Sequence, residues 1–280
     1  MNKFMNLPDK YAGEDSKFLV INIPWEKDVT YGKGASKGPE EIIKASHQLE
    51  YFDIEAELEV FEQGIKTIDI TPKVFEDIQE QILKMGFKDK FPVFLGGDHS
   101  ITIPTVKIIE SIKEDFDMIV FDSHADFFYS WNSSENNHRC VNRRLIDNHN
   151  ILVIGLRSCD IEEFNEMNKD ERINYIKANK FNLDVLKKQL SKLKKKIYIS
   201  IDVDVFDPSF IRNTGTPEPG GLSWNNVLEA LELIFASKNV LAADINEFAP
   251  NSNFDAEAYS LAKLVYKLFI LKNNFSNINK

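Results

Sequence analysis

The sequence predicts a three-layer α/β/α fold, in which a central, mostly parallel sheet lies between two layers of helices. Short apolar runs recur along the whole chain, and most are followed by a segment with helical periodicity. These runs are continuously apolar, as expected for strands that are covered on both faces. The chain has no Pro/Gly/Ser-rich linker and no repeat, which favours a single domain over residues 1–280.

Six runs rich in β-branched, leucine or aromatic residues are predicted strands: 18–23, 91–95, 116–121, 151–156, 197–201 and 240–245. Seven segments with apolar residues at helical spacing are predicted helices: 39–49, 72–85, 101–113, 160–167, 183–194, 224–236 and 255–271. Residues 127–137 are too long and too polar for an ordinary turn, so we expect a functional loop there.

Composition and charge exclude several classes of protein. Of the 280 residues, 43% are hydrophobic and 28% are charged, which is typical of a globular chain. The formal net charge of −10 argues against nucleic acid or an anionic membrane as a partner, because both attract positive charge. No run approaches the roughly 18 apolar residues of a membrane span, and the N-terminus lacks a signal-peptide pattern. We therefore expect a cytoplasmic protein that binds metal ions or small cations.

Three clusters of acidic and histidine residues directly follow predicted strands. They are residues 96–100 (GGDHS), 122–126 (DSHAD) and 202–204 (DVD). The carboxyl ends of parallel strands meet at one edge of the sheet, where ligands bind, so we expect the clusters to converge. Alternate side chains of an extended segment point the same way, so Asp122, His124 and Asp126 would share one side. The same spacing relates Asp202 and Asp204.

Carboxylates gathered in this way need positive charge, because they otherwise repel one another and raise each other's pKa. Two divalent ions about 3.5–4 Å apart would supply that charge. Carboxylate and imidazole ligands without thiolate suit Mn²⁺, Fe²⁺ or Zn²⁺. Structural roles are the alternative, with Asp98 as a helix cap and His99 as a hydrogen-bonded core residue. Asp202 and Asp204 fit that alternative poorly, because they would be buried unpaired among apolar neighbours.

The motifs and their order resemble those of the ureohydrolase (arginase/agmatinase) family. The three clusters match its three signatures, the third extending over residues 200–208 (SIDVDVFDP). Further matches are residues 33–39 (KGASKGP), 214–223 (TGTPEPGGLS) and 244–250 (DINEFAP). The similarity spans nearly the whole chain, and the 214–223 run most resembles the agmatinase branch. Two-metal phosphoesterases also use a D-x-H motif, but here the GGDH element comes first and no GNH follows.

The resemblance implies an arginase-like fold with two Mn²⁺ per subunit, in homo-oligomers of three or six subunits. The implied ligands are His99, Asp122, Asp126 and Asp202 for one ion, and Asp122, His124, Asp202 and Asp204 for the other. The ions would activate a shared water, oriented by Asp126, for attack on a guanidinium carbon. Glu247 would bind the guanidinium group. His138 would pass a proton to the leaving amine, unless it is an ordinary surface-loop histidine.

The predicted substrate is a small cationic guanidino compound. Aromatic residues follow the second cluster, so Phe128 would lie along the methylene chain of agmatine and Glu135 near its ammonium group. The products would be urea and putrescine. Arg139 stands where the family has a small residue, and it would instead suit the carboxylate of 4-guanidinobutyrate. Because Asn137 and Asn142 also depart from the family pattern, an inactive metal-binding homologue is a further alternative.

Overall fold

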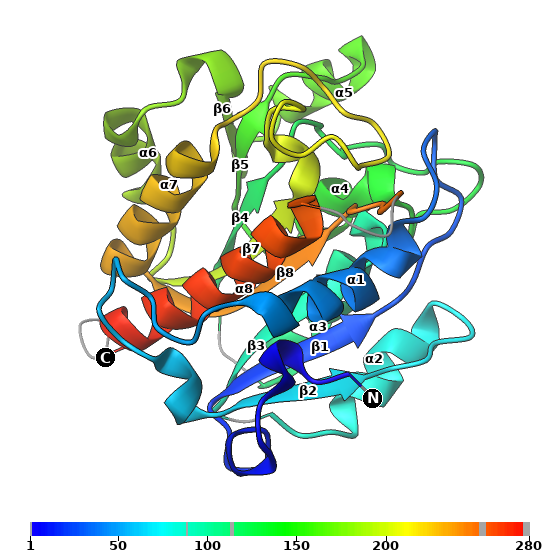
Figure 1. Cartoon of the computed structure of the whole chain (residues 1–280). Helices are drawn as coiled ribbons and strands as arrows, with labels where there is room; N and C mark the ends of the chain where they lie inside the picture. Colours follow the sequence, from blue (N-terminus) through cyan, green and yellow to red (C-terminus); the bar gives the residue numbers. More distant parts are fainter. Residues whose placement is uncertain (1, 88, 113–114, 252–255, 277–280) are drawn as a thin grey trace.

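The computed structural model describes the chain except for residues 1, 88, 113–114, 252–255 and 277–280 (Figure 1). The strands of the described part are β1 (Phe18–Ile23), β2 (Ile65–Asp69), β3 (Phe91–Gly96), β4 (Asp117–Phe121), β5 (Ile151–Leu156), β6 (Ile173–Lys177), β7 (Lys196–Asp202) and β8 (Asn239–Asn246). Its α-helices are α1 (Gly38–Ala45), α2 (Glu76–Leu83), α3 (Thr102–Ile112), α4 (Val141–Leu145), α5 (Ile161–Met167), α6 (Leu183–Leu190), α7 (Trp224–Ser237) and α8 (Ala256–Phe275).

The strands form one sheet in the order β2-β1-β3-β8-β7-β4-β5-β6, and every neighbouring pair is parallel. Helices α1, α8, α7 and α6 contact one another in that order over one face (Figure 1). Helices α2, α3, α4 and α5 pack on the other face. In β1, Phe18 and Val20 join the first core and Leu19 and Ile21 the second. The predicted three-layer fold is therefore confirmed.

The six predicted strands are present, and β1 and β5 have the predicted bounds. The prediction misses β2 and β6, which lie at the two edges of the sheet. Each edge strand is only partly buried, so it carries polar residues such as Lys66 and Asn174 beside its isoleucines. A search for continuous apolar runs does not detect strands of this kind, because they are not covered on both faces.

The seven predicted helices are also present, with shifted ends, and the short helix α4 is an addition. Helix α2 begins at Glu76 rather than at residue 72 because the Asp77 carboxylate accepts hydrogen bonds from the backbone N–H groups of Lys73 and Val74. The predicted end at Lys113 and the predicted start at Asp255 lie outside the described residues. None of the helices described has the length and apolar character needed to cross a bilayer.

The central strands β3, β8, β7 and β4 are neighbours, and the predicted clusters follow three of them. His99 follows β3, Asp122 to Asp126 follow β4, and Asp202 ends β7. Glu247 follows β8 directly. Because the strands are parallel, all these side chains reach the same edge of the sheet.

Candidate metal and substrate site

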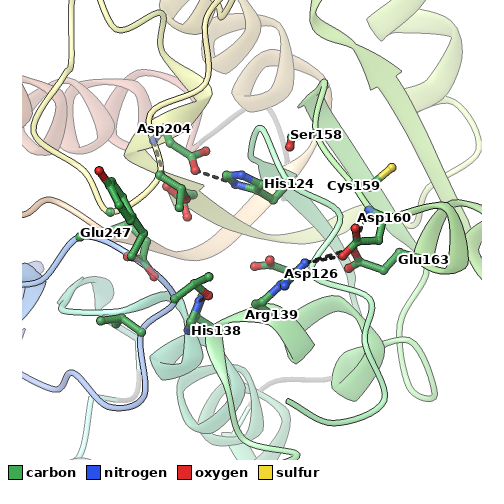
Figure 2. Close-up of a pocket in the computed structure, with 17 residues that line it drawn as sticks. His124, Asp126, His138, Arg139, Ser158, Cys159, Asp160, Glu163, Asp204 and Glu247 are labelled. Carbon is green, nitrogen blue, oxygen red and sulfur yellow. Dashed lines mark hydrogen bonds and ion pairs between the residues drawn. The ribbon is translucent and has the colours of Figure 1, made fainter. Parts of the chain in front are cut away.

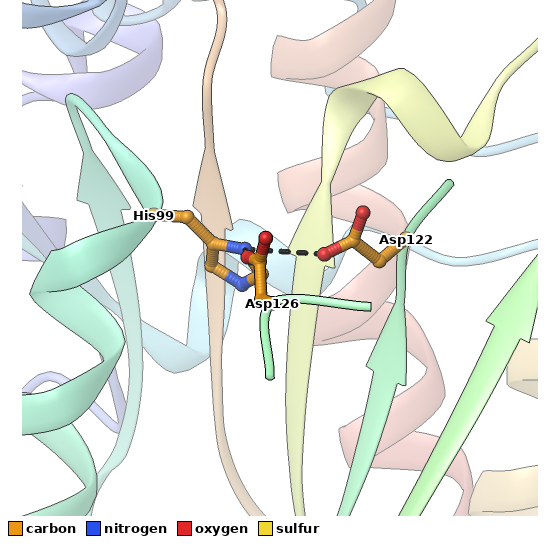
Figure 3. A group of neighbouring side chains, drawn as sticks. All are labelled: His99, Asp122 and Asp126. Atoms are coloured by element: carbon orange, nitrogen blue, oxygen red, sulfur yellow. Dashed lines mark hydrogen bonds and ion pairs between the residues drawn. The ribbon is translucent and has the colours of Figure 1, made fainter. Parts of the chain in front are cut away.

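The first group of potential metal ligands consists of His99, Asp122 and Asp126, all of them buried. Nδ1 of His99 lies 2.9 Å from Oδ2 of Asp126 and 3.2 Å from Oδ2 of Asp122. Figure 3 shows these carboxylates beside the imidazole ring. Oδ2 of Asp202 lies 3.5 Å from the same nitrogen. One ring nitrogen therefore faces three carboxylates from two different strand ends.

The second group consists of Asp122, His124 and Asp204, so Asp122 belongs to both groups. Nδ1 of His124 lies 2.8 Å from Oδ2 of Asp204 and 3.7 Å from Oδ1 of Asp122. The backbone N–H of Asp204 donates to Oδ1 of Asp202 at 2.9 Å, which ties the end of β7 to the turn that carries Asp204. The structure thus brings together all six residues that the sequence predicted as ligands.

These donors fit divalent cations. Oδ2 of Asp122 is buried and has no hydrogen bond among the described residues. Burial and the charges of Asp126 and Asp204 raise the pKa of Asp122 to about 7. Burial alone would lower the pKa of His124, but Asp204 and Asp122 raise it to about 10. The carboxylates are thus short of positive charge, and oxygen and imidazole donors without sulfur suit ions such as Mn²⁺.

A chain of buried hydrogen bonds orients His99 from behind. Ser200 donates to Oδ1 of Asp244 at 2.6 Å, and Tyr198 donates to Oδ2 of Asp244 at 2.5 Å. Because the single hydroxyl proton of Ser200 is used, its oxygen accepts from Nε2 of His99, 2.9 Å away. Nδ1 is then the nitrogen that faces the carboxylates, and although burial would lower the pKa of His99, their charge raises this pKa well above its ordinary value. A bound cation would replace the proton on Nδ1 and take its lone pair. Sequence reasoning missed this chain, since its members lie inside strands.

Arg157 fixes the second ligand group from outside. Its guanidinium donates to the backbone carbonyls of Asp204 at 2.6 Å, Glu218 at 2.7 Å and Phe206 at 3.3 Å. These bonds join the end of β5 to the turn that carries Asp204. They also reach the 214–223 segment, which contributes Gly215 and Thr216 to the neighbouring pocket. No pattern in the sequence pointed to this role.

Two residues at the site have left-handed backbone conformations, which residues other than glycine rarely adopt. Asp126 has φ of 48° and Glu247 has φ of 66°. The carbonyl of Asp126 accepts the N–H of Asn142 at 3.0 Å, while Oε1 of Glu247 accepts the N–H of His99 at 2.7 Å. Strained residues held by their surroundings in this way are typical of functional sites.

A pocket of about 220 Å³ opens over the ligand groups (Figure 2). Its lining residues are Val29, Thr30, Tyr31, Gly32, His124, Asp126, His138, Arg139, Ser158, Cys159, Asp160, Glu163, Asp202, Asp204, Gly215, Thr216 and Glu247. Two loops meet at its wall, where Gly32 donates to the carbonyl of Gly215 at 3.1 Å. A Cβ on Gly32 would lie only 2.8 Å from Gly215, so this contact requires glycine.

His138 lines the pocket from the short turn before α4. Its Nε2 lies 2.8 Å from the hydroxyl oxygen of Thr30, and its Nδ1 is buried without a hydrogen bond among the described residues. Burial lowers the pKa of His138 below its ordinary value. The lowered pKa favours the neutral imidazole, in which one nitrogen faces Thr30 and the other has no hydrogen bond among the described residues.

The residues predicted to contact the substrate chain are placed differently. Arg139 lines the pocket, but Phe128 and Glu135 do not. Phe128 packs against the Arg139 guanidinium, whose carbon lies 4.4 Å from the ring centroid. Glu135 pairs with Arg144, with an N–O distance of 2.7 Å. The structure therefore places Phe128 and Glu135 outside the pocket lining, because Phe128 packs against Arg139 and Glu135 pairs with Arg144.

Asp160 and Glu163 are pocket residues that the sequence analysis did not select. Asp160 caps α5, and Oε2 of Glu163 accepts the N–H of Asp160 at 3.1 Å. Burial raises the pKa of Glu163. The D-x-x-E spacing is a visible signal, but it predicts a capped helix rather than a pocket wall.

The parallel sheet and the carboxylate and imidazole groups at its edge define an α/β protein with a candidate metal site at the carboxyl ends of its strands. The family model described as the arginase family matches residues 16–271. The N(1)-aminopropylagmatine ureohydrolase of Thermus thermophilus is 33% identical over 92% of this chain and 91% of its own length. The agmatinase of Pyrococcus horikoshii is 32% identical over 90% of this chain and 91% of its own.

A solved structure, that of the agmatine ureohydrolase of Thermoplasma volcanium, superposes with a TM-score of 0.85. The two chains are 26% identical, and the match covers 99% of this chain and 96% of the other. The chain therefore belongs to the arginase family, as its motifs predicted. It is an agmatinase-like ureohydrolase.

Proposed function

We propose that the protein hydrolyses a guanidino compound with a cationic tail to urea and an amine, using two Mn²⁺ per subunit. The observation that carries this proposal is the distribution of carboxylates in the pocket. Four residues of the ligand groups line it, and so do Glu247, Asp160 and Glu163; the four are His124, Asp126, Asp202 and Asp204. A guanidinium held at the floor and an ammonium group along the wall would meet this charge at both ends.

Agmatine and N(1)-aminopropylagmatine are the proposed substrates, since relatives at similar identity bear both names. Both carry a guanidinium and at least one amine, and the products would be urea with putrescine or its aminopropyl derivative. Arg139 does not favour 4-guanidinobutyrate, because its Nη2 already donates to Oδ2 of Asp160 at 2.9 Å. A carboxylate tail would have to displace that partner.

The side chains of the pocket have separate tasks in the proposed reaction. Bound divalent ions supply the charge that activates water for attack on the guanidinium carbon. Glu247 binds the NH₂ groups of the substrate, and its carboxylate is held in position by the N–H of His99. Asp126 orients the attacking water. His138, neutral and with an unpaired Nδ1, takes up a proton released by the attacking water and passes it to the departing amine.

Urea release from a panel of guanidino compounds tests the proposal. The panel contains agmatine, N(1)-aminopropylagmatine, arginine and 4-guanidinobutyrate, each assayed with Mn²⁺ and again after chelation. We expect urea from the first two compounds only, and only with metal. Absence of urea from every compound would indicate an inactive homologue. A preference for 4-guanidinobutyrate would instead support recognition of a carboxylate by Arg139.

The family resemblance also predicts homo-oligomers of three or six subunits. The sequence pattern itself predicts a cytoplasmic location and a single ureohydrolase domain over residues 1–280. Mass measurement in solution tests the first prediction, since a monomer at assay concentration would contradict it. These properties stay predictions alongside the choice of Mn²⁺ as the metal.

A further inference from the structure

Arg139 is enclosed by charged and aromatic side chains on the pocket wall. Its guanidinium carbon lies 4.4 Å from the ring centroid of Phe128 and 4.0 Å from that of Trp131. Its Nη2 lies 2.9 Å from Oδ2 of Asp160 and 3.7 Å from Oε2 of Glu163 (Figure 2). Two rings and two carboxylates therefore hold one guanidinium in place.

The aromatic and acidic contacts give this guanidinium fixed partners of its own. A free arginine side chain beside Glu247 would compete with the substrate guanidinium, because the two groups have the same chemistry. Stacking on Phe128 and pairing with Asp160 hold the Arg139 guanidinium on the pocket wall. The side chain is thus built into the pocket without blocking the reacting end of the substrate.

We infer that Arg139 is a specificity-determining residue that limits the positive charge of the substrate tail. The inference rests on the proposed function and deepens it. With Arg139 present, the wall formed with Asp160 and Glu163 has one carboxylate in excess, which suits the single ammonium of agmatine. Without Arg139 it would have two, which suits a tail with two amines. The side chain therefore favours agmatine over N(1)-aminopropylagmatine.

The ratio of kcat/KM for agmatine to that for N(1)-aminopropylagmatine tests this inference. Arg139→Gln removes the charge and should move the ratio about ten-fold toward N(1)-aminopropylagmatine, mainly through KM. This is the size expected for two charges about 10 Å apart at an effective dielectric constant of about 20. Arg139→Lys keeps the charge and should keep most of the preference.

Arg144, in the neighbouring helix α4, offers a matched control. It also pairs with an acid, Glu135, and lies over an aromatic ring, Tyr129, but it does not line the pocket. Arg144→Gln should therefore leave the substrate ratio unchanged. Equal shifts in Arg139→Gln and Arg144→Gln, or no shift in Arg139→Gln while urea is still released, would overturn the inference. Absence of urea from the unmodified protein would instead refute the proposed function.

Asp160→Asn tests the same charge balance if Arg139→Gln does not fold. This change leaves the wall with no carboxylate in excess over Arg139. We expect it to lower the preference for agmatine over N-butylguanidine, whose tail is neutral, by about ten-fold. An unchanged preference would contradict a role for wall charge in selecting the tail.

Discussion

Two buried carboxylate clusters in this molecule are neutralised in different ways. At the first, Asp53 is 1% exposed, and its two oxygens accept from Nζ of Lys263 and of Lys267, each at 2.9 Å. Burial would raise the pKa of Asp53, but Lys267 and Lys263 lower it to about 2. This carboxylate has its counter-ions within the chain.

The second cluster is the metal-ligand group at the end of the sheet. Its ion pairs among the described residues are with His99 and His124. Burial and like charges raise the pKa of Asp122 to about 7 and that of Asp202 well above its ordinary value. The comparison teaches that burial alone does not identify a ligand site. Several adjacent buried acids that raise one another's pKa and have no lysine or arginine partner among the described residues are short of positive charge, which bound cations would supply.

The largest expected effect is on activity, which should depend on the second cluster but not on the first. Asp204→Asn removes a ligand and should lower kcat/KM for urea release by at least about a thousand-fold, because the metal site is incomplete. Asp53→Asn should retain most of the activity. Urea assays with circular dichroism on both variants provide the measurement. Unchanged turnover in a folded Asp204→Asn protein would refute the two-metal mechanism.

Metal removal should lower the thermal stability of the protein through the second cluster and not through the first. Ions that bind only the folded state at about a hundred times their Kd contribute about 2.7 kcal/mol per site, so chelation should lower Tm by about 5–10 °C. Added Mn²⁺ should restore Tm in the unmodified protein and in Asp53→Asn. A Tm that is independent of Mn²⁺ would show that the second cluster does not need external charge.

Arg157→Lys should weaken the metal site without removing a ligand. Lysine cannot bind the carbonyls of Asp204 and Glu218 together as the planar guanidinium does. Mn²⁺ affinity, measured by calorimetry, should fall about ten-fold, which is typical for loss of an orienting contact. Arg144→Lys provides the control, and an equal loss in both variants would argue against a specific role for Arg157.

Asp53→Asn should have the smallest effect, a loss of about 1–2 kcal/mol in the free energy of unfolding at pH 7. The folded-state pKa of about 2 lies below the usual 3.8, so this contribution is complete above about pH 4. It declines as the pH falls from 4 toward 2. Urea unfolding of both proteins at several pH values measures this contribution. A difference in their free energies of unfolding that grows below pH 4 would contradict the predicted direction of the pH dependence.

The sequence predicts the ligand groups well because their members lie in short motifs, each at the end of a predicted strand. His124 and Asp126 need only local spacing and a parallel sheet to meet Asp122. The lysine-paired cluster was not predictable in this way, because Asp53 and Lys267 are 214 residues apart and neither lies in a motif. Their meeting depends on how α8 packs, which local periodicity does not specify.

The substrate wall was predicted less well than the ligands for a related reason. Phe128 and Glu135 were expected to face the substrate on the basis of residue type alone. Their arginine partners are Arg139 in the turn before α4 and Arg144 in α4, and the pairing depends on how the loop folds against these elements. Asp160 was visible only as a helix cap. Side chains that satisfy one another across an irregular loop leave no periodic signal.

Titration of the metal-free protein with Mn²⁺, with urea release from agmatine and N(1)-aminopropylagmatine followed at each step, tests the central claim most directly. We predict no urea without metal and activity that reaches its maximum at two bound ions per chain. Full activity in the metal-free protein, or no urea at two bound ions, would contradict the assignment of the acidic cluster as the hydrolytic metal site.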